Sequence, residues 1–296
     1  MELFSAPIVY ADKIYAMKIQ YLMAILFLSF NLKAITPTSP DPESGKIVYL
    51  NGKYEGKYNA EGKRSGYGVA KVTESSYYEG NWENDFRQGQ GFCAYPNGDK
   101  YTGEWIADMR TGKGTYTFAN GEKYTGEFFE DEMHGKGTYY YASGDRYEGS
   151  FEYGIVSGLG TTLYASGDKY EGNYQNGKRT GKGKYFYKDG RVYDGKFSED
   201  FKVGIATMYY PDGSKYTGEF TNNKLTGKGT FKYTNGDYYT GEFVNGKMQG
   251  KGTFFWSNGD KYEGEFKNNK RDGEGVLLSK SGVNTAKVYS YGVEIK

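Results

Sequence analysis

The sequence predicts an all-β protein, an elongated single-layer antiparallel β-meander of about ten stacked hairpins. The first observation behind this prediction is a tyrosine that returns every 23 residues. The second is that each copy contains two short segments in which packed and polar positions alternate. The third is a glycine-containing dipeptide at the junction between copies. The periodic tyrosines are Tyr54, one residue out of phase, followed by Tyr78, Tyr101, Tyr124, Tyr147, Tyr170, Tyr193, Tyr216, Tyr239 and Tyr262.

The segment before the repeats has a different character. Residues 19–32 form an uncharged, mostly apolar run of fourteen residues. A membrane span needs about 20 residues, so this run suits a signal-peptide core or a short apolar helix better. We expect residues 1–34 to be a signal or anchor segment and residues 35–44 to be a Pro- and Ser-containing linker. A helix that packs on the sheet and a misassigned start are the alternatives. The protein is then membrane-associated or exported, with a cytoplasmic location as the alternative.

The copy that begins at Tyr101 shows how one repeat is built. Tyr101, Gly103 and Trp105 alternate with polar residues, which is the pattern of a strand with one packed face. A second alternating strand starts at Gly112, and the polar residues 106–111 between the two strands suit a hairpin loop. We expect Trp105 to face Gly112, Gly103 to face Gly114, Tyr101 to face Tyr116, and Glu104 to meet Lys113 on the other face.

Each copy joins the next through Asn-Gly, Ser-Gly or Asp-Gly, as at Asn120 and Gly121. Glycine tolerates the positive φ that tight turns require. A two-residue turn would place the next tyrosine on the wrong face, so we expect a three-residue loop that ends on the glycine. The product is a sheet of about 20 strands, on the order of 100 Å long.

An array of stacked repeats needs a capping strand at each end of the sheet. Residues 45–53 suit a half-repeat cap, residues 54–284 hold the ten repeats, and residues 285–296 suit a closing strand.

Composition narrows the possible functions. The 38 Lys and Arg residues nearly balance the 37 Asp and Glu residues, which removes the positive field expected of a nucleic-acid-binding protein. Cys93 is the only cysteine and His134 the only histidine, so neither has a companion for a disulfide or a metal site. We expect no nucleic-acid partner and no cofactor or metal, and we expect Cys93 to be a packing residue.

The repeated pattern is Tyr-x-Gly-x-aromatic, six variable residues and Gly-x-Gly, with Asn-Gly before the next copy. It closely resembles the MORN (membrane occupation and recognition nexus) repeat over residues 54–282. The resemblance implies an elongated sheet that serves as a scaffold, either free-standing or joined to a catalytic domain such as a lipid kinase or a lysine methyltransferase. Because few residues lie outside the repeats of this sequence, we expect no appended enzyme here. For free-standing members it implies tethering at membranes or cytoskeletal structures, and the binding of a partner segment in an aromatic-lined groove.

A non-enzymatic scaffold that binds a protein partner is the first functional hypothesis. We expect part of an aromatic row to stay accessible and to hold apolar side chains of the partner. Packing of these rings only on each other is the alternative. The row consists of Trp82, Trp105, Phe128, Phe151, Tyr174, Phe197, Phe220, Phe243 and Phe266.

Binding of anionic phospholipids, such as phosphoinositides, is the second hypothesis. Most copies carry a cation at a nearly fixed place in the first loop, and clustered cations attract anionic lipids. A solvated edge that prevents strand aggregation explains the same residues. The candidates are Arg87, Arg110, Arg179, Lys202, Lys224, Lys247, Lys270 and Arg271.

An enzyme is the least favoured hypothesis. The sequence lacks a G-x-x-x-x-G-K-[ST] phosphate loop, and His134 has no partner at catalytic spacing. A hydrolase that combines carboxylates from distant copies is the remaining variant. We also expect that two copies can form a homodimer through their terminal repeats.

Overall fold

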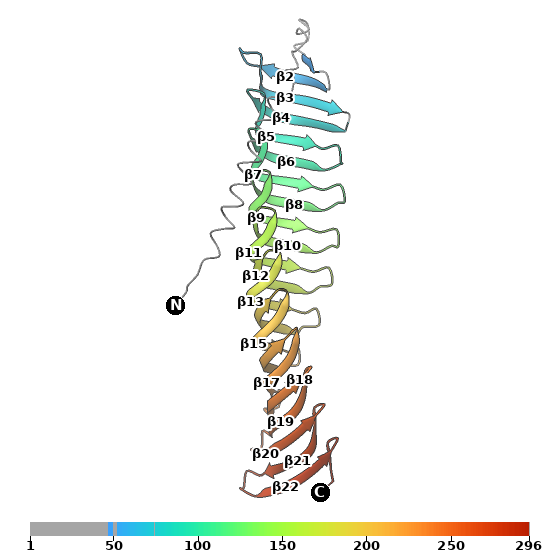
Figure 1. The fold of residues 1–296 in the computed structure, drawn as a ribbon, viewed down its shortest axis with the longest axis vertical. Helices are drawn as coiled ribbons and strands as arrows, with labels where there is room; N and C mark the ends of the chain where they lie inside the picture. Colours follow the sequence, from blue (N-terminus) through green and yellow to red (C-terminus); the bar gives the residue numbers. More distant parts are fainter. Residues whose placement is uncertain (1–46, 50–51, 74, 296) are drawn as a thin grey trace, which may run out of the picture.

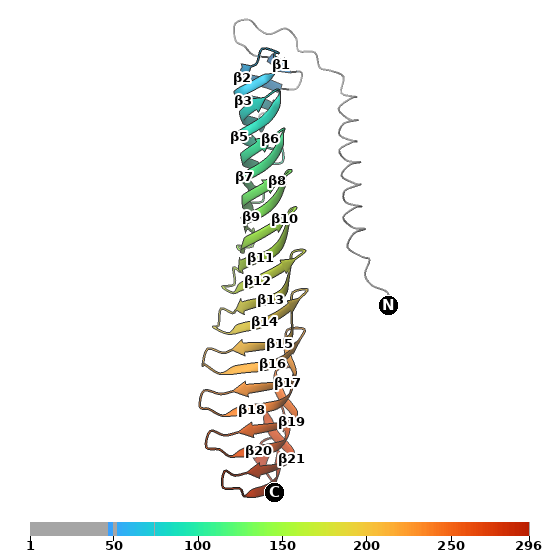
Figure 2. The same ribbon diagram turned by 90° about the vertical axis from the view of Figure 1, so that its left-hand side faces the viewer.

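The computed structural model describes residues 47–49, 52–73 and 75–295. These residues form a single sheet of 23 antiparallel strands, in which each strand pairs with the one that follows it in the chain. The sheet is a long, narrow, twisted rod (Figures 1 and 2). The predicted all-β meander is therefore confirmed, with 23 strands instead of about 20. The expected N-terminal signal, anchor or helix and the linker lie outside the described residues.

The strands are β1 (Ile47–Tyr49), β2 (Gly52–Tyr58), β3 (Arg64–Thr73), β4 (Ser76–Glu83), β5 (Phe86–Ala94), β6 (Lys100–Ile106), β7 (Met109–Thr117), β8 (Lys123–Phe129), β9 (Glu132–Tyr140), β10 (Arg146–Glu152), β11 (Ile155–Leu163), β12 (Lys169–Gln175), β13 (Lys178–Phe186), β14 (Val192–Ser198), β15 (Phe201–Tyr209), β16 (Lys215–Thr221), β17 (Lys224–Lys232), β18 (Tyr238–Val244), β19 (Lys247–Phe255), β20 (Lys261–Lys267), β21 (Lys270–Leu278), β22 (Asn284–Ser290) and β23 (Val293–Glu294).

The two ends of the sheet carry short strands. At the N-terminal end β1 pairs with the first part of β2. At the C-terminal end β22 follows the last repeat, and the two residues of β23 pair with it. Among the described residues, no helix is long and apolar enough to cross a membrane.

The hairpin of β6 and β7 confirms half of the predicted register. Tyr101 faces Tyr116 and Gly103 faces Gly114, as expected. The prediction for Trp105 is wrong, because Trp105 faces Arg110 and the chain reverses in a two-residue turn with φ of 48° and 68°. The register shifts after Gly103, which leaves Gly112 and Lys113 as a bulge on β7. The strands thus extend farther than the alternation of residues suggested, and Arg110 turns onto the packed face.

The bulge also changes the contact between Glu104 and Lys113. The Glu104 carboxylate accepts a hydrogen bond of 2.9 Å from the backbone N–H of Lys113. In register, Lys113 stands opposite Glu127 of the following copy. The glutamate therefore holds the bulge of its own hairpin, and the expected pairing of side chains on one hairpin becomes a pairing between copies.

The loops between copies are as predicted. Phe118 donates its N–H to the carbonyl of Glu122 at 2.9 Å, and Gly121 donates to the carbonyl of Phe118 at 3.0 Å. Three residues lie between Phe118 and Glu122, and the last of them, Gly121, has a φ of 90°. This loop keeps every periodic tyrosine on the same face of the sheet.

The packed face is a continuous ladder of rings, formed by each periodic tyrosine and the aromatic residue four positions after it. Tyr101 is fully buried, and its ring packs edge-to-face on Trp105 at 5.1 Å and on Phe128 of the next copy at 5.0 Å. The tyrosine lies against Gly103 and Gly114, where a Cβ would come within 2.4–2.5 Å of its atoms. Each ring thus joins two hairpins. We call this set the ring ladder.

The glycines under the ring ladder make a specific stability prediction. A Cβ at Gly103 would stand 2.4 Å from the Tyr101 hydroxyl and 2.6 Å from the Gly114 backbone, so Gly103→Ala forces the hairpin apart. We expect a loss of about 1–3 kcal/mol in the free energy of unfolding, measured by urea denaturation. The neighbouring exposed Thr102→Ala should change it by less than about 0.5 kcal/mol. Equal denaturation midpoints for the two variants would contradict this packing.

Candidate partner-binding site

The aromatic row named in the partner hypothesis is buried. All nine side chains are at most 8% exposed. The expectation that part of this row stays accessible is therefore wrong. Each ring lies edge-to-face between two tyrosines, as Trp105 does between Tyr78 and Tyr101. We call the place of the residue nine positions after the tyrosine of the preceding copy, such as Arg87 for Trp105, the covering position. The buried set is Trp82, Trp105, Phe128, Phe151, Tyr174, Phe197, Phe220, Phe243 and Phe266.

An arginine of the preceding copy covers the ring in several repeats. The guanidinium carbon of Arg87 lies 4.1 Å from the centre of the Trp105 ring. Arg87 Nε donates to Asp108 Oδ1 at 2.9 Å, and Nη2 donates to the Asp108 carbonyl at 2.9 Å. The backbone N–H of Arg87 donates to the same carboxylate at 2.8 Å. Because Asp108 lies in the turn of the next copy, the arginine locks two hairpins together.

The same lock recurs and removes most of the candidate lipid-binding cations from the exposed edge. Arg110 pairs with Asp131 and Arg179 with Asp200 in the same way. Arg271 is half-buried and donates to the Tyr289 hydroxyl at 2.8 Å. The two-residue turn places the residue nine positions after each periodic tyrosine on the packed face of the sheet. Five of the eight candidate cations stand at this position and do not form an exposed edge. These five are Arg87, Arg110, Arg179, Lys202 and Arg271, whereas Lys224, Lys247 and Lys270 are exposed on the turns.

Lys202 is the variant of this lock with a lysine. Its side chain is 7% exposed and donates to the Tyr187 hydroxyl at 2.6 Å. Burial, together with Arg179 and Arg191, lowers the pKa of Lys202 to about 8. Asn223 replaces the turn aspartate and accepts the Lys202 backbone N–H at 2.9 Å. The amide keeps the hydrogen bond and removes the carboxylate.

Other copies use an apolar version of the lock. Met133, Val156 and Leu225 occupy the covering position, and the matching turn residues are Gly154, Gly177 and Gly246. In each case the glycine N–H donates to the backbone carbonyl of the covering residue, at 2.8–3.0 Å. Arginine is thus matched with a turn aspartate in four copies and these three apolar residues with glycine, whereas Met248 meets Asn269 and Arg271 meets Gly292.

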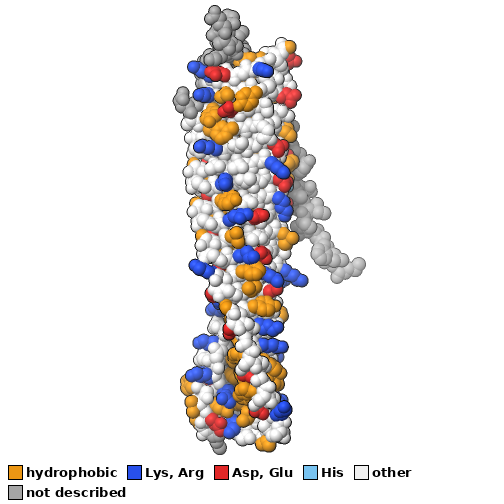
Figure 3. All heavy atoms as spheres, turned by 180° about the vertical axis from the view of Figure 1, so that it is seen from behind, with side chains coloured by type: hydrophobic (Ala, Val, Ile, Leu, Met, Phe, Trp, Pro, Cys, Tyr) orange, Lys and Arg blue, Asp and Glu red, His pale blue; other side chains and the backbone are white. Residues whose placement is uncertain are grey.

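A second set of rings lies beside the ring ladder and is only partly buried, which the sequence analysis missed. The sequence signal for this set is the aromatic residues that recur fifteen and seventeen positions after the tyrosine. Neighbouring rings are 4.5–5.9 Å apart, for example Tyr139 and Tyr141 at 4.5 Å. Figure 3 shows hydrophobic side chains at intervals along one face of the rod. The set includes Tyr95, Tyr116, Phe118, Tyr139, Tyr164, Tyr185, Tyr187, Tyr210, Phe231, Tyr233, Phe254 and Trp256.

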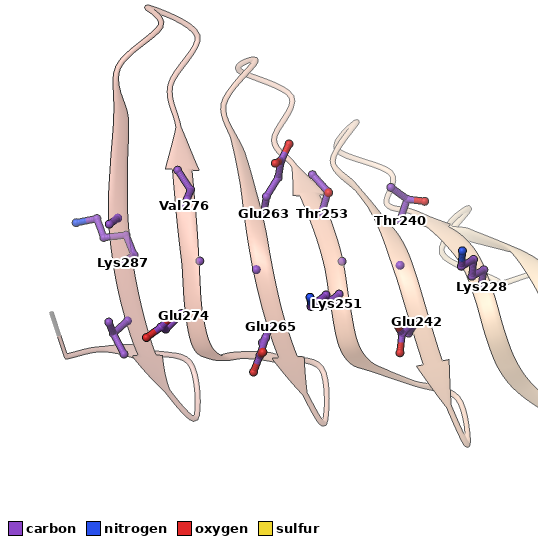
Figure 4. Close-up of a pocket in the computed structure, with 16 residues that line it drawn as sticks. Lys228, Thr240, Glu242, Lys251, Thr253, Glu263, Glu265, Glu274, Val276 and Lys287 are labelled. Atoms are coloured by element: carbon purple, nitrogen blue, oxygen red, sulfur yellow. The ribbon is translucent and has the colours of Figure 1, made fainter.

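The opposite face of the sheet holds an open trough. Near the C-terminal end it encloses about 920 Å³ over a floor that contains Gly241, Gly252, Gly264 and Gly275. Hollows of about 710 and 540 Å³ repeat the arrangement nearer the N-terminus. In Figure 4, Thr240, Thr253, Glu263 and Val276 line one side, and Glu242, Lys251, Glu265 and Glu274 line the other. We call this surface the glycine trough.

The chemistry of the trough suits binding. The C-terminal part carries four carboxylates and the ammonium groups of Lys228, Lys251 and Lys287. Its lining contains no cysteine, serine or histidine. In the part of the chain that the structure describes, no three His, Cys, Asp or Glu side chains gather as metal ligands would. His134 lies in β9 and packs beside Phe129 and Tyr153, and the free Cys93 is buried, with the pKa of its thiol raised by burial.

Comparison with known proteins identifies the repeat. The profile of the MORN repeat matches nine consecutive stretches, residues 78–100, 101–123, 124–146, 147–169, 170–190, 193–215, 216–238, 239–261 and 262–283. The copy at Tyr54 lies before these stretches, although β2 and β3 form its hairpin. No curated protein sequence matches the chain.

Similar solved structures share only weak likeness. The TCP domain of Drosophila melanogaster SAS-4 (dCPAP), in complex with a proline-rich motif of Ana2 (dSTIL), is 17% identical, with 51% of this chain and 83% of that chain covered and a TM-score of 0.35. The CPAP G-box domain is 14% identical, with 68% and 100% covered and a TM-score of 0.33. The TCP10 domain of Danio rerio CPAP is 8% identical, with 82% and 99% covered and a TM-score of 0.23. TM-scores this low do not indicate what the chain binds.

The two versions of the lock predict a compensation. Arg87→Met alone leaves Asp108 without its guanidinium, and Asp108→Gly alone leaves Arg87 without its carboxylate. The double variant reproduces the natural pair Met133 and Gly154. We expect each single change to lower the free energy of unfolding and the double variant to recover about 0.5–2 kcal/mol relative to additivity. A double-mutant cycle by urea denaturation measures this, and strict additivity would refute the lock.

The ring ladder predicts a dependence on alkaline pH. Burial raises the pKa of Tyr147, Tyr170 and Tyr239 from 10.0 to about 12. The fold favours the neutral phenol, so this stabilisation is complete below pH 10 and is lost as pH rises through about 12. Tyrosinate absorbance, followed together with circular dichroism, should show the ladder tyrosines ionising only as the strands unfold. Ionisation of every tyrosine near pH 10 with unchanged dichroism would show that the ladder is open to water.

Proposed function

Because the chain belongs to the MORN repeat family, we propose that it is a non-enzymatic scaffold that binds an extended segment of a partner protein in the glycine trough. The MORN repeat is a scaffold family and not a known enzyme family. The observation that carries the proposal is the trough itself, a hollow of about 920 Å³ that lies on the open face of the sheet and has charged walls.

The two faces of the sheet differ in what they can offer a partner. The ring ladder is already filled, so a partner could reach those rings only by separating hairpins. The trough presents backbone over its glycines, threonine hydroxyls and charges of both signs on its walls. Such a surface selects a partner by charge pattern and hydrogen bonding more than by apolar burial.

The length of the array supports a tethering role within this proposal. The trough recurs along the rod, at Gly103 and Gly114 in the N-terminal half and at Gly241 and Gly252 near the C-terminus. A partner segment can therefore be held at a distance from the point where the rod is attached. Attachment at a membrane through residues 1–34 is part of the proposal, and sequencing of the mature N-terminus tests that part.

Blocking the trough should remove partner binding. A photo-crosslinking residue at Thr253 in the full-length protein identifies the partner, and binding is then measured with purified components. We expect Thr253→Arg with Val276→Arg to weaken binding at least tenfold, since both side chains line the trough. Val283→Arg, at an exposed position on a nearby loop, is the matched control. Unchanged affinity in the trough variant would reject the trough as the binding site.

Anionic lipid is a second candidate ligand, because three of the candidate lysines are exposed. Lys224, Lys247 and Lys270 lie on successive turns of the same edge. If they bind lipid, co-sedimentation with vesicles of phosphatidylcholine and phosphatidylserine should be lost when all three become glutamate, and also at high salt. Pure phosphatidylcholine vesicles are the control. Absence of sedimentation with the anionic vesicles would eliminate this candidate.

A further inference from the structure

One wall of the glycine trough carries a regular cross-strand pair. The pair joins the middle residue of a Gly-x-Gly segment to the residue that faces it on the following strand. In three places it is a lysine with a glutamate, as at Lys228 and Glu242 in Figure 4. Opposite charges at facing positions stabilise a sheet, so this pair suits the fold. The three pairs are Lys113 with Glu127, Lys228 with Glu242 and Lys251 with Glu265.

The regular pair is lost in the middle of the rod. Lys182 on β13 faces Lys196 on β14, although like charges at facing positions destabilise a sheet. Leu159 and Ile205 stand at the lysine position on β11 and β15 and are 63% and 68% exposed. We call this stretch of the wall the central wall. Its four consecutive pairs are Lys136 with Ser150, Leu159 with Asn173, Lys182 with Lys196 and Ile205 with Glu219.

The lysines of the central wall have no carboxylate partner. In the part of the chain that the structure describes, neither Lys182 nor Lys196 takes part in an ion pair. Lys136 Nζ donates to the neutral Ser150 Oγ at 2.8 Å. The central wall therefore presents three ammonium groups and a single carboxylate, that of Glu219 at its C-terminal end.

The opposite wall of the trough is already neutralised at this level. Its carboxylates are held by cations of the same chain, so they do not balance the lysines across the trough. The excess positive charge is thus confined to the central wall. The ion pairs of the opposite wall are Asp194 with Lys184 at 3.1 Å, Glu171 with Lys169 at 2.7 Å and Glu148 with Arg146.

We propose that the middle of the glycine trough holds an acidic segment of the partner protein. Its carboxylates pair with Lys182 and Lys196, and its apolar side chains cover Leu159 and Ile205. This inference rests on the proposed function and adds the chemistry of the bound segment to it. A cross-strand pair that opposes folding, beside exposed apolar residues, indicates a surface that another molecule completes.

The dimensions of the central wall suit an extended chain. Four strand spacings separate Leu159 from Ile205, about 19 Å, which about six residues of extended chain span. Lys182 and Lys196 lie between them on adjacent strands, about 4.8 Å apart, so neighbouring acidic residues can reach both ammonium groups. Leu159 and Lys136 also line the hollow of about 710 Å³. The bound segment then runs along the rod, across the strands.

An anionic membrane is a poorer match for this surface. A bilayer would cover both walls and would bring the carboxylates of Glu148, Glu171 and Asp194 against its phosphates. Leu159 and Lys136 line a hollow, which a narrow chain can enter and a bilayer surface cannot. Charge and shape therefore favour an acidic protein segment.

Lys196→Glu separates binding from folding. It restores the Lys–Glu pair found elsewhere on this wall, so the urea denaturation midpoint should be unchanged or higher. Acidic peptides should nevertheless bind the variant at least tenfold more weakly. The probes are peptides selected on the full-length protein from a phage library of random dodecapeptides, and fluorescence anisotropy measures their affinity. Lys188→Glu, on an exposed loop between copies, is the control with the same charge change and should leave the affinity unchanged.

Leu159→Gln with Ile205→Gln tests the apolar contacts. Glutamine occupies the same position at Gln90, so the fold should tolerate it. The same peptides should bind this variant at least threefold more weakly, because their apolar side chains lose the surface that they cover. We expect the selected peptides to combine two or more Asp or Glu residues with an apolar residue.

The outcomes distinguish this inference from the proposed function. Unchanged affinity for Lys196→Glu, or selected peptides without an excess of acidic residues, would overturn the inference. Peptides that Thr253→Arg with Val276→Arg blocks but Lys196→Glu does not would overturn it and leave the proposed function standing. Peptides that neither variant blocks, or a selection that yields none, would reject both. Sedimentation with phosphatidylserine vesicles that Lys196→Glu abolishes would assign the central wall to a membrane instead.

Discussion

The whole fold depends on one contact, a tyrosine ring that lies flat on two facing glycines. At Tyr101 the ring rests on Gly103 and Gly114, where no side chain could fit. Its edge meets Trp105 of its own copy and Phe128 of the next. A single-layer sheet has no second layer to cover its apolar face, so the rings must bury one another. Glycine lets them lie low enough to do so, which explains why nearly every periodic tyrosine comes with a glycine on both strands of its hairpin. Beside Tyr193, Ala206 takes one of these places.

The ring ladder makes the copies interdependent, and the covering residues complete that dependence. One hairpin buries too little apolar area to offset its backbone entropy, so its neighbours must contribute. The Arg87–Asp108 lock adds hydrogen bonds and a cation–π contact between copies. Elsewhere Met133 with Gly154 fills the same place by apolar packing. The array therefore alternates between two ways of joining hairpins without changing its backbone.

The sequence alone could predict what depends on spacing. The tyrosine period, the facing glycines and the three-residue loops follow from alternation, which a strand obeys strictly. The tight turns could not be predicted, because Gly112 reads as an ordinary strand position although its φ is 55° and it starts a bulge. That bulge turns Arg110 inward, where its guanidinium carbon lies 4.8 Å from the centre of the Tyr116 ring. The trough could not be predicted either, because it depends on which face of the sheet each residue takes, and that requires the register.

Where the fold leaves a position free, its residue types carry information about partners. Ring and glycine positions are fixed by packing, so their repetition reports only the fold. The outer positions of the tight turns are exposed, and they are Phe, Ile, Glu, Lys, Val, Met, Gln, Ser or Thr in different copies. Random variation at such positions would scatter charges along the rod. Instead the carboxylates and apolar side chains gather in one half and the lysines in the other, although the whole chain is nearly neutral. Folding does not require that segregation.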